Sequence, residues 1–173
     1  MKIRTRFFSE IDIADSEIIL FPFGVYGFEE HNRFVLLHDE EDENEMFMWL
    51  QSVDEENLCF VVMEPEKIYA GYSPKLPSDI LRKIGAETEN DIRYIVMSAI
   101  RKDIKKSTVN LLGPIVINPK KKVALQVVLD PSETQNSRYK TKYDLFSADD
   151  DFSESEEELY EERDIEEEGA QIC

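Results

Sequence analysis

Short runs of apolar, β-branched and aromatic residues recur along this chain, and they constrain its fold more than any other feature. Lys2–Phe7 alternates strictly, which places Ile3, Thr5 and Phe7 on one side of a half-buried strand. Prolines, glycines and an aspartate separate the later runs, as expected at turns between strands. These runs are Glu17–Phe21, Arg33–His38, Met46–Gln51, Leu58–Met63, Ile92–Ile100, Val109–Asn118 and Val123–Leu129. Seven or eight short strands at this spacing indicate an antiparallel sandwich or barrel.

One segment has the pattern of a helix. Ser78 can cap a short helix that begins near Asp79, its apolar residues share one face, and Gly85 can end it. The large residues expected to fill a barrel interior are Phe34, Phe47, Trp49 and Phe60. We therefore expect a mainly β fold: a small antiparallel β-barrel-like single domain over residues 1–146, with one short helix, and an acidic C-terminal tail over residues 147–173.

This C-terminal tail carries most of the chain's net charge of −18. Thirteen residues between Asp149 and Glu168 are acidic, and Arg163 is the only basic residue among them. Like charges four residues apart oppose a helix, so we expect the tail to be disordered, or helical only against a cationic partner. A simpler interpretation is that the tail only keeps the protein soluble.

A second acidic block lies between two predicted strands. Its carboxylates are Asp39, Glu40, Glu41, Asp42, Glu43 and Glu45. The block lacks the glycine and the bidentate glutamate that a calcium-binding EF-hand loop requires, so no specific metal site is expected. A chain this acidic is repelled by nucleic acid and by anionic lipid, because both bind proteins through Lys and Arg. The expected partner is a basic protein surface, with no direct nucleic acid and no membrane.

Residues with catalytic or targeting roles are missing from the sequence. No signal peptide and no run of about 18 apolar residues is present, so we expect a cytoplasmic protein. His31 and His38 lack metal-ligand spacing, and Cys59 and Cys173 suggest neither a disulfide framework nor a metal site. No nucleophile elbow and no phosphate-binding glycine loop occurs. We expect no catalysis and no cofactor.

Two basic clusters, Arg101–Lys106 and Lys120–Lys122, leave an alternative open. In an OB-like barrel such loops could bind single-stranded nucleic acid, with the acidic tail as an autoinhibitor. However, no aromatic residue is interleaved with either cluster to stack a base, and lysines commonly protect strand edges. The clusters could also hold the chain's own tail.

Three blocks of sequence resemble a known family. They are Ile18–Glu29 followed by Arg33–Leu37, Phe47–Asp54 leading into Phe60–Val62 and Glu64–Pro65, and Thr108–Asn118 continued by Gln126–Leu129. Their order, turn residues and strand spacing over residues 3–130 resemble the flagellar assembly factor FliW family. The segment Ser137–Phe146 and the long acidic extension depart from the family's pattern.

The resemblance implies a non-enzymatic, β-barrel-like protein that exchanges between two partners. One partner is flagellin, which such a factor binds as a chaperone before export. The other is CsrA, an RNA-binding translational repressor that FliW-like proteins antagonise. Abundant flagellin occupies the factor and frees the repressor, whereas export of flagellin returns the factor to the repressor and relieves repression. We expect the free protein to be a monomer.

Charge suggests how such antagonism could work. A repressor that binds RNA has a positive surface, so a protein of charge −18 docked beside it would repel phosphates without occupying the RNA site. We therefore expect noncompetitive, partly electrostatic antagonism. The block from Asp39 to Glu45 would be its ordered component, because predicted strands flank it on both sides.

Four further residues are candidates for protein binding. Tyr69 and Tyr72 lie in a loop-like segment, where aromatic residues tend to anchor interfaces, and a groove between them could take an amphipathic flagellin helix. The alternative is that both tyrosines belong to the core. Asn110 and Asn118 bracket a Gly-Pro strand, where their amides either contact a partner or cap the local backbone.

Overall fold

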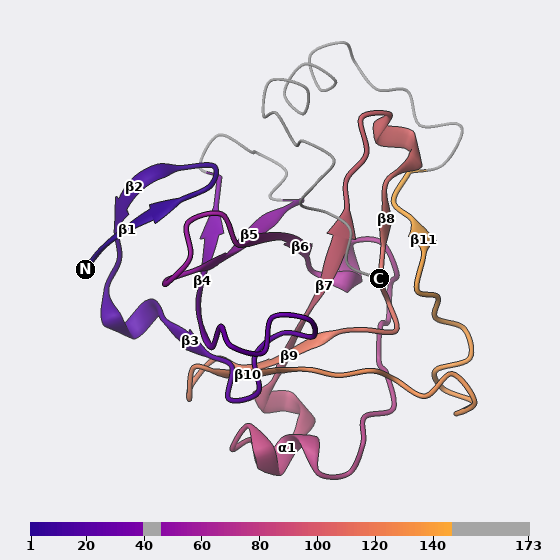
Figure 1. The fold of residues 1–173 in the computed structure, drawn as a ribbon. Helices are drawn as coiled ribbons and strands as arrows, with labels where there is room; N and C mark the ends of the chain where they lie inside the picture. Colours follow the sequence, from indigo (N-terminus) through magenta and orange to yellow (C-terminus); the bar gives the residue numbers. More distant parts are fainter. Residues whose placement is uncertain (40–45, 147–173) are drawn as a thin grey trace.

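The computed structural model of the protein describes residues 1–39 and 46–146, and strands dominate it (Figure 1). One sheet holds β1 (Lys2–Thr5) and β2 (Ser9–Asp12). The second sheet holds β3 (Ile19–Leu20), β4 (Arg33–His38), β5 (Met48–Ser52), β6 (Cys59–Met63), β7 (Arg93–Ala99), β8 (Thr108–Val109), β9 (Ile115–Asn118), β10 (Val123–Gln126) and β11 (Tyr143–Asp144). The α-helix is α1 (Ile80–Lys83), and short 3-10 turns cover Asp15–Glu17, Pro65–Lys67, Glu89–Asp91 and Ile104–Lys106.

Strands of the second sheet close into a barrel, in the order β3, β4, β5, β6, β7, β9, β10 (Figure 1). Two pairings complete the ring, one between β7 and β9 and one between β10 and β3. The contact between β10 and β3 is parallel and pairs Val123 with Leu20, whereas the other strand pairs of the described residues are antiparallel. The expected mainly β, barrel-like fold with one short α-helix is confirmed, with this parallel contact as an addition.

Two strands were not expected from the sequence. β2 is polar and exposed, and it forms a hairpin with β1 that lies at one side of the barrel next to β4 (Figure 1). β11 is only two residues long and pairs with β8. The expected strand at Val109–Asn118 divides into β8 and β9, because the backbone N–H of Leu111 turns away to donate to the Lys140 carbonyl and Pro114 has no N–H to donate.

The barrel wall is apolar on both faces. Side chains from alternate positions fill the interior, namely Phe21, Phe34, Met48, Leu50, Phe60, Val62, Ile95, Ile115, Ile117 and Ala124. The intervening residues point outward into a second core under α1 and the C-terminal loops, where Trp49, Met63, Val96, Val116 and Leu125 pack. Phe34 and Phe60 therefore lie in the interior as expected. Phe47 and Trp49 are also buried, but in the second core rather than inside the barrel.

The helix α1 lies below β9 and β10 and covers this second core (Figure 1). It begins one residue later than expected, with Asp79 rather than Ser78 in the N-cap position and without a side-chain cap. The Asp79 carboxylate instead pairs with Lys83 Nζ at 2.7 Å, one turn further along the helix. Gly85 follows in the left-handed conformation, with φ of +66°, and ends the helix as predicted.

Candidate protein-binding surface

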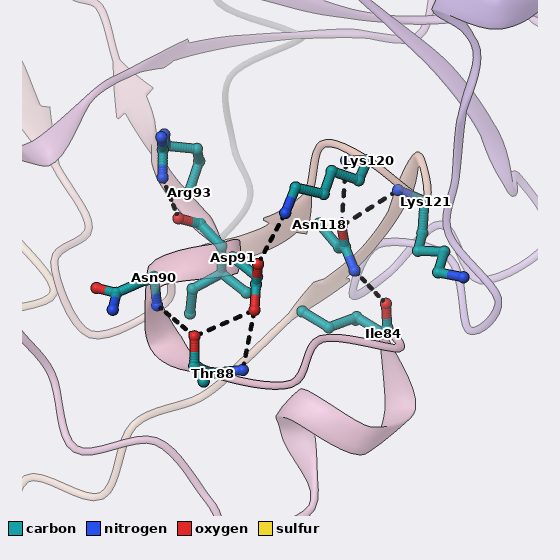
Figure 2. Close-up of polar contacts among 9 residues, drawn as sticks. Ile84, Thr88, Asn90, Asp91, Arg93, Asn118, Lys120 and Lys121 are labelled. Carbon is teal, nitrogen blue, oxygen red and sulfur yellow. Dashed lines mark hydrogen bonds and ion pairs between the residues drawn. The ribbon is translucent and has the colours of Figure 1, made fainter.

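Asn118 is 2% exposed and connects α1 to the turn between β9 and β10 (Figure 2). Its amide nitrogen donates to the Ile84 carbonyl at 3.0 Å, and its Oδ1 accepts from the backbone N–H groups of Lys120 and Lys121 at 3.1 and 3.2 Å. Both ends of the amide are therefore occupied within the protein. In this structure Asn118 caps backbone groups, which is the alternative left open above, and offers nothing to a partner.

A second polar contact in Figure 2 holds the same turn from the other side. Asp91 accepts hydrogen bonds from Lys120 Nζ, from the Thr88 backbone N–H and from the Thr88 hydroxyl, each at 3.1 Å. The hydrogen bond from Lys120, followed by those from Thr88, lowers the pKa of the Asp91 carboxyl. One lysine of the basic cluster 120–122 is thus engaged with the protein's own carboxylate.

The structure places Tyr72 in the core, which corrects the expectation that it rims a groove. Its side chain is 4% exposed, its hydroxyl donates to the Leu111 carbonyl at 2.7 Å, and burial raises the pKa of that hydroxyl. The Tyr72 ring also packs edge-on against Tyr94. Tyr69 is half-buried and contacts the ring of Tyr139 at a centroid distance of 5.2 Å. The sequence predicted a surface loop here, because the residues that pack against these tyrosines, such as Tyr94 and Tyr139, are distant in sequence.

Two other predicted site residues that the structure describes, Asn110 and Asp39, follow different strands, β8 and β4. Asn110 is half-buried, and its Oδ1 accepts from the Leu112 backbone N–H at 3.1 Å. Its amide nitrogen would stand 2.6 Å from a Cβ at Gly113, so this glycine lets the asparagine cap the turn. Asp39 follows β4 and is half-buried, whereas Glu40, Glu41, Asp42, Glu43 and Glu45 lie outside the described residues.

An open groove of about 820 Å³ separates parts of β6 and β7. The two strands pair only where Val62 faces Met97 and Met63 faces Val96. On either side of the groove lie Cys59–Val61 from β6 and the stretch from Met97 to Ile100, which begins in β7. Residues Cys59–Val61 pair with β5 on one edge, but no strand of the described residues pairs with their other edge, which faces β7. Apolar side chains therefore line an opening in the barrel wall at this point.

The rim of this groove combines apolar and basic side chains. Tyr26 and Val128 are 52% and 65% exposed, and the Tyr26 backbone N–H donates to Gln126 Oε1 at 3.0 Å. Cations at the rim come from Arg6, Arg101 and Lys142. Sequence reasoning missed Tyr26 and Val128, although one signal was available: Tyr26 stands between two turn glycines, where a large apolar side chain has no strand neighbour to cover it.

The groove also contains a cysteine thiol and a buried serine hydroxyl. Burial raises the pKa of the Cys59 thiol to about 12, so this thiol stays protonated and unreactive at neutral pH. The Oγ of Ser98, also at the groove, is buried and has no hydrogen-bond partner among the described residues.

Within residues 1–39 and 46–146, no group of three or more His, Cys, Asp or Glu residues is arranged to hold a metal ion. The described helices include none with the length and apolar character needed to cross a membrane.

The described residues therefore define a small, closed β-barrel protein of the mainly β class, with one short α-helix. A family model described as FliW protein matches residues 2–145. Flagellar assembly factor FliW from Lachnospira eligens is 33% identical over 148 residues, which cover 84% of this chain and 95% of that protein. The counterpart from Syntrophus aciditrophicus is 39% identical over 145 residues, with 84% and 87% covered. This chain belongs to the FliW family.

A solved structure supports the same conclusion. The crystal structure of the flagellar assembly factor FliW superposes with a TM-score of 0.77 at 34% identity, covering 87% of this chain and all of that one. The family match also extends past residue 130, where the sequence blocks ended, and includes β11. The acidic tail after residue 146 lies beyond the matched range.

Proposed function

We propose that this protein is a non-enzymatic flagellar assembly factor that binds flagellin as a chaperone and binds a CsrA-type translational repressor. Bound to the repressor, it relieves repression of flagellin translation; bound to flagellin, it leaves the repressor free to act. Membership of the FliW family over residues 2–145 carries this proposal. The exchange belongs in the cytoplasm, where translation occurs, and the free protein acts as a monomer.

The groove between β6 and β7 is our candidate for the flagellin contact. The ends of flagellin are amphipathic helices, and such helices bind by placing an apolar face in an apolar groove. Exposed Val128 and Tyr26 offer apolar area at its rim. Tyrosine is one of the residue types enriched among those that contribute most of the binding energy in interfaces. Tyr69 keeps a partly exposed ring on another loop and remains a second candidate.

Direct binding tests the flagellin contact. Purified flagellin is titrated against the wild-type protein and against Val128→Glu, with affinity measured by isothermal titration calorimetry. We expect about tenfold weaker binding for the variant, because a carboxylate enters an apolar contact. Phe23→Glu is the matched control, since Phe23 is 64% exposed but does not line the groove. If Val128→Glu and Phe23→Glu bound flagellin with equal affinity, the groove would not be the flagellin site.

The repressor contact rests on charge. A net charge of −18 suits a cationic RNA-binding surface, and the block from Asp39 to Glu45 concentrates six carboxylates after β4. Docked beside the RNA site, these charges would oppose phosphate binding without blocking the site itself. We therefore propose noncompetitive, partly electrostatic antagonism.

Neutralising these six acids to Asn and Gln tests this mechanism. The repressor's affinity for RNA is measured by fluorescence anisotropy with and without the factor, at several salt concentrations. We expect the variant to inhibit RNA binding less than wild type, and the difference to shrink as salt screens charge. Unchanged inhibition across the salt series argues against electrostatics, although the family assignment would stand.

A nucleic-acid-binding barrel with an autoinhibitory tail is the competing function. Among its proposed contacts, Lys106 pairs with Asp103 at 2.9 Å and Lys120 with Asp91 at 3.1 Å, so two of its cations already have carboxylate partners. Removing residues 149–173 separates the two functions. Gain of RNA binding by the shortened chain supports the competing function, and no gain supports the flagellar one.

A further inference from the structure

We propose that the chain's own acidic segment Asp149–Tyr160 docks into the groove between β6 and β7 and shields it from other proteins. This inference goes beyond the proposed function, since it concerns the free protein and needs neither flagellin nor a repressor. Three observations carry it: the charges at the rim, the exposed apolar side chains in the groove, and the place where the tail leaves the barrel.

The first observation is charge complementarity. Arg6, Arg101 and Lys142 stand at the groove, and none of them pairs with a carboxylate among the described residues. Other surface cations, such as Lys83, do have such partners. The segment Asp149–Tyr160 holds seven acidic residues and no basic one. Attraction between an unpaired basic rim and this segment would therefore be favourable and salt-dependent.

The second observation is the exposed apolar area. Val128 is 65% exposed in the groove, and Tyr26 is 52% exposed at its edge. Covering such area releases water and is favourable. Among its acids the segment carries Phe152, Leu159 and Tyr160, which supply apolar surface to pack there.

The third observation is reach. β11 pairs with β8, the backbone N–H of Leu145 donates to the Ser107 carbonyl at 3.0 Å, and Lys142 already lines the groove. The chain therefore leaves the barrel beside this opening. Phe152 follows the last described residue, Phe146, by six positions, a span of roughly 20 Å when extended. The family match stops at residue 145, so the proposed segment lies outside the range that the family model matches.

Paramagnetic relaxation in the full-length chain tests the docking. A nitroxide is attached to Ser155→Cys in a Cys173→Ser background, where Cys59 stays unlabelled because it is buried and its thiol pKa is about 12. We expect strong broadening of the backbone amide signals of Val61 and Ser98 at low salt. This broadening should fall to background at ~0.5 M NaCl, where the screening length is only a few ångströms.

Matched variants identify the contact. Arg101→Glu with Lys142→Glu should reduce the broadening at least about fivefold, since each reversal replaces attraction with repulsion. Lys75→Glu with Lys121→Glu changes the net charge equally at exposed sites outside the groove and should leave it unchanged. Phe152→Ser, a change outside residues 1–146, should also weaken the broadening. Broadening that is absent at low salt, or equal in all four proteins, overturns the proposal and leaves the groove open to external partners alone.

Discussion

At the residue scale, buried polar side chains connect parts of the chain that are distant in sequence. Gln51 is fully buried, and its Oε1 accepts from the Arg6 backbone N–H at 3.1 Å, which attaches the β1–β2 hairpin to the barrel. Asn136 is equally buried, and its Oδ1 accepts from the Lys75 backbone N–H at 2.8 Å. Such groups satisfy backbone atoms that burial would otherwise leave unpaired, so their loss should reduce stability more than activity.

Asn118 gives the first prediction at this scale. Asn118→Ala removes the donor to the Ile84 carbonyl and the acceptor for two backbone N–H groups. We expect the free energy of unfolding to fall by about 1–3 kcal/mol, because a buried carbonyl loses its partner. Urea unfolding followed by circular dichroism measures this change. Asn118→Asp keeps the acceptor but places a buried carboxylate oxygen against the Ile84 carbonyl, so it should also destabilise the fold. An unchanged midpoint for Asn118→Ala would contradict the assignment.

Tyr72 gives the second prediction. Tyr72→Phe removes only the hydroxyl that donates to the Leu111 carbonyl, and it should cost about 1 kcal/mol of stability. Tyr72→Ala also removes a buried ring and should cost about 3–5 kcal/mol. Thermal unfolding compares the two with wild type. If Tyr72→Ala had the stability of the wild-type protein, Tyr72 would again be a candidate for a surface binding site.

The carboxyl of Asp91 gives a pH-dependent prediction. Hydrogen bonds from Lys120 and Thr88 lower its pKa in the folded protein, so it stabilises the fold above the unfolded pKa of about 3.9. This contribution is lost as the pH falls through the folded pKa. Lys120→Met should therefore lower the thermal midpoint at neutral pH, and the deficit should shrink below about pH 3.9. A deficit that is constant with pH would exclude the ion pair as its cause.

At the element scale, the loop after β3 shows how glycine geometry shapes the groove. Gly24 has φ of +66°, and a Cβ there would stand 2.5 Å from the Glu29 Cα. Gly27 has φ of +83°, but a Cβ there would meet nothing within 4 Å. Both glycines permit left-handed backbone, while only Gly24 also permits close packing of the loop. This packing positions Tyr26 at the groove.

The two glycines form a matched pair for mutation. Gly27→Ala should cost about 1–2 kcal/mol, since only left-handed strain is added. Gly24→Ala should cost more, because the backbone of Glu29 must also move. Chemical unfolding of both variants measures the difference. Equal losses would show that the loop relaxes freely around Gly24.

At the scale of the whole molecule, two cores share one barrel wall. The interior core and the outer core under α1 use alternate residues of the same strands, so β5 is buried along its full length. By contrast, within residues 1–39 and 46–146, β1 and β2 pair only with each other, and the small cluster of Ile3, Ile13, Val35 and Val53 joins them to the barrel. Local stability should therefore differ across the molecule.

Hydrogen exchange tests this difference. Backbone amides of β1 and β2 should exchange at least about tenfold faster than those of β5, because the hairpin can open without breaking the barrel. Mass spectrometry of deuterium uptake at neutral pH measures both regions in one experiment. Equal protection would mean that the hairpin unfolds only with the whole domain.

The sequence anticipated the class of fold and most of its strands. Period-two alternation in Lys2–Phe7 and turn residues such as Gly85 are local signals. The structure has a strand at Lys2–Thr5 and a left-handed backbone at Gly85, as these signals predicted. The sequence could not predict that Trp49 points outward from the barrel. Every residue of β5 is buried, so the residue pattern of this strand does not distinguish its two faces. Of the candidate site, the acidic block is a local feature of the sequence, whereas the expected groove position of Tyr72 was wrong because long-range contacts bury this residue. For Asn118 the sequence left a partner contact and a backbone cap open, and the structure shows the cap.

What the sequence by itself determined is the set of short strands, their turns and the concentration of negative charge, because each depends on neighbouring residues along the chain. The tertiary structure alone decided how the ring closes through β10 and β3, which tyrosine is covered, and where β6 separates from β7 to open a groove. Those features arise from contacts between residues far apart in sequence, and no local pattern specifies which distant residues come into contact.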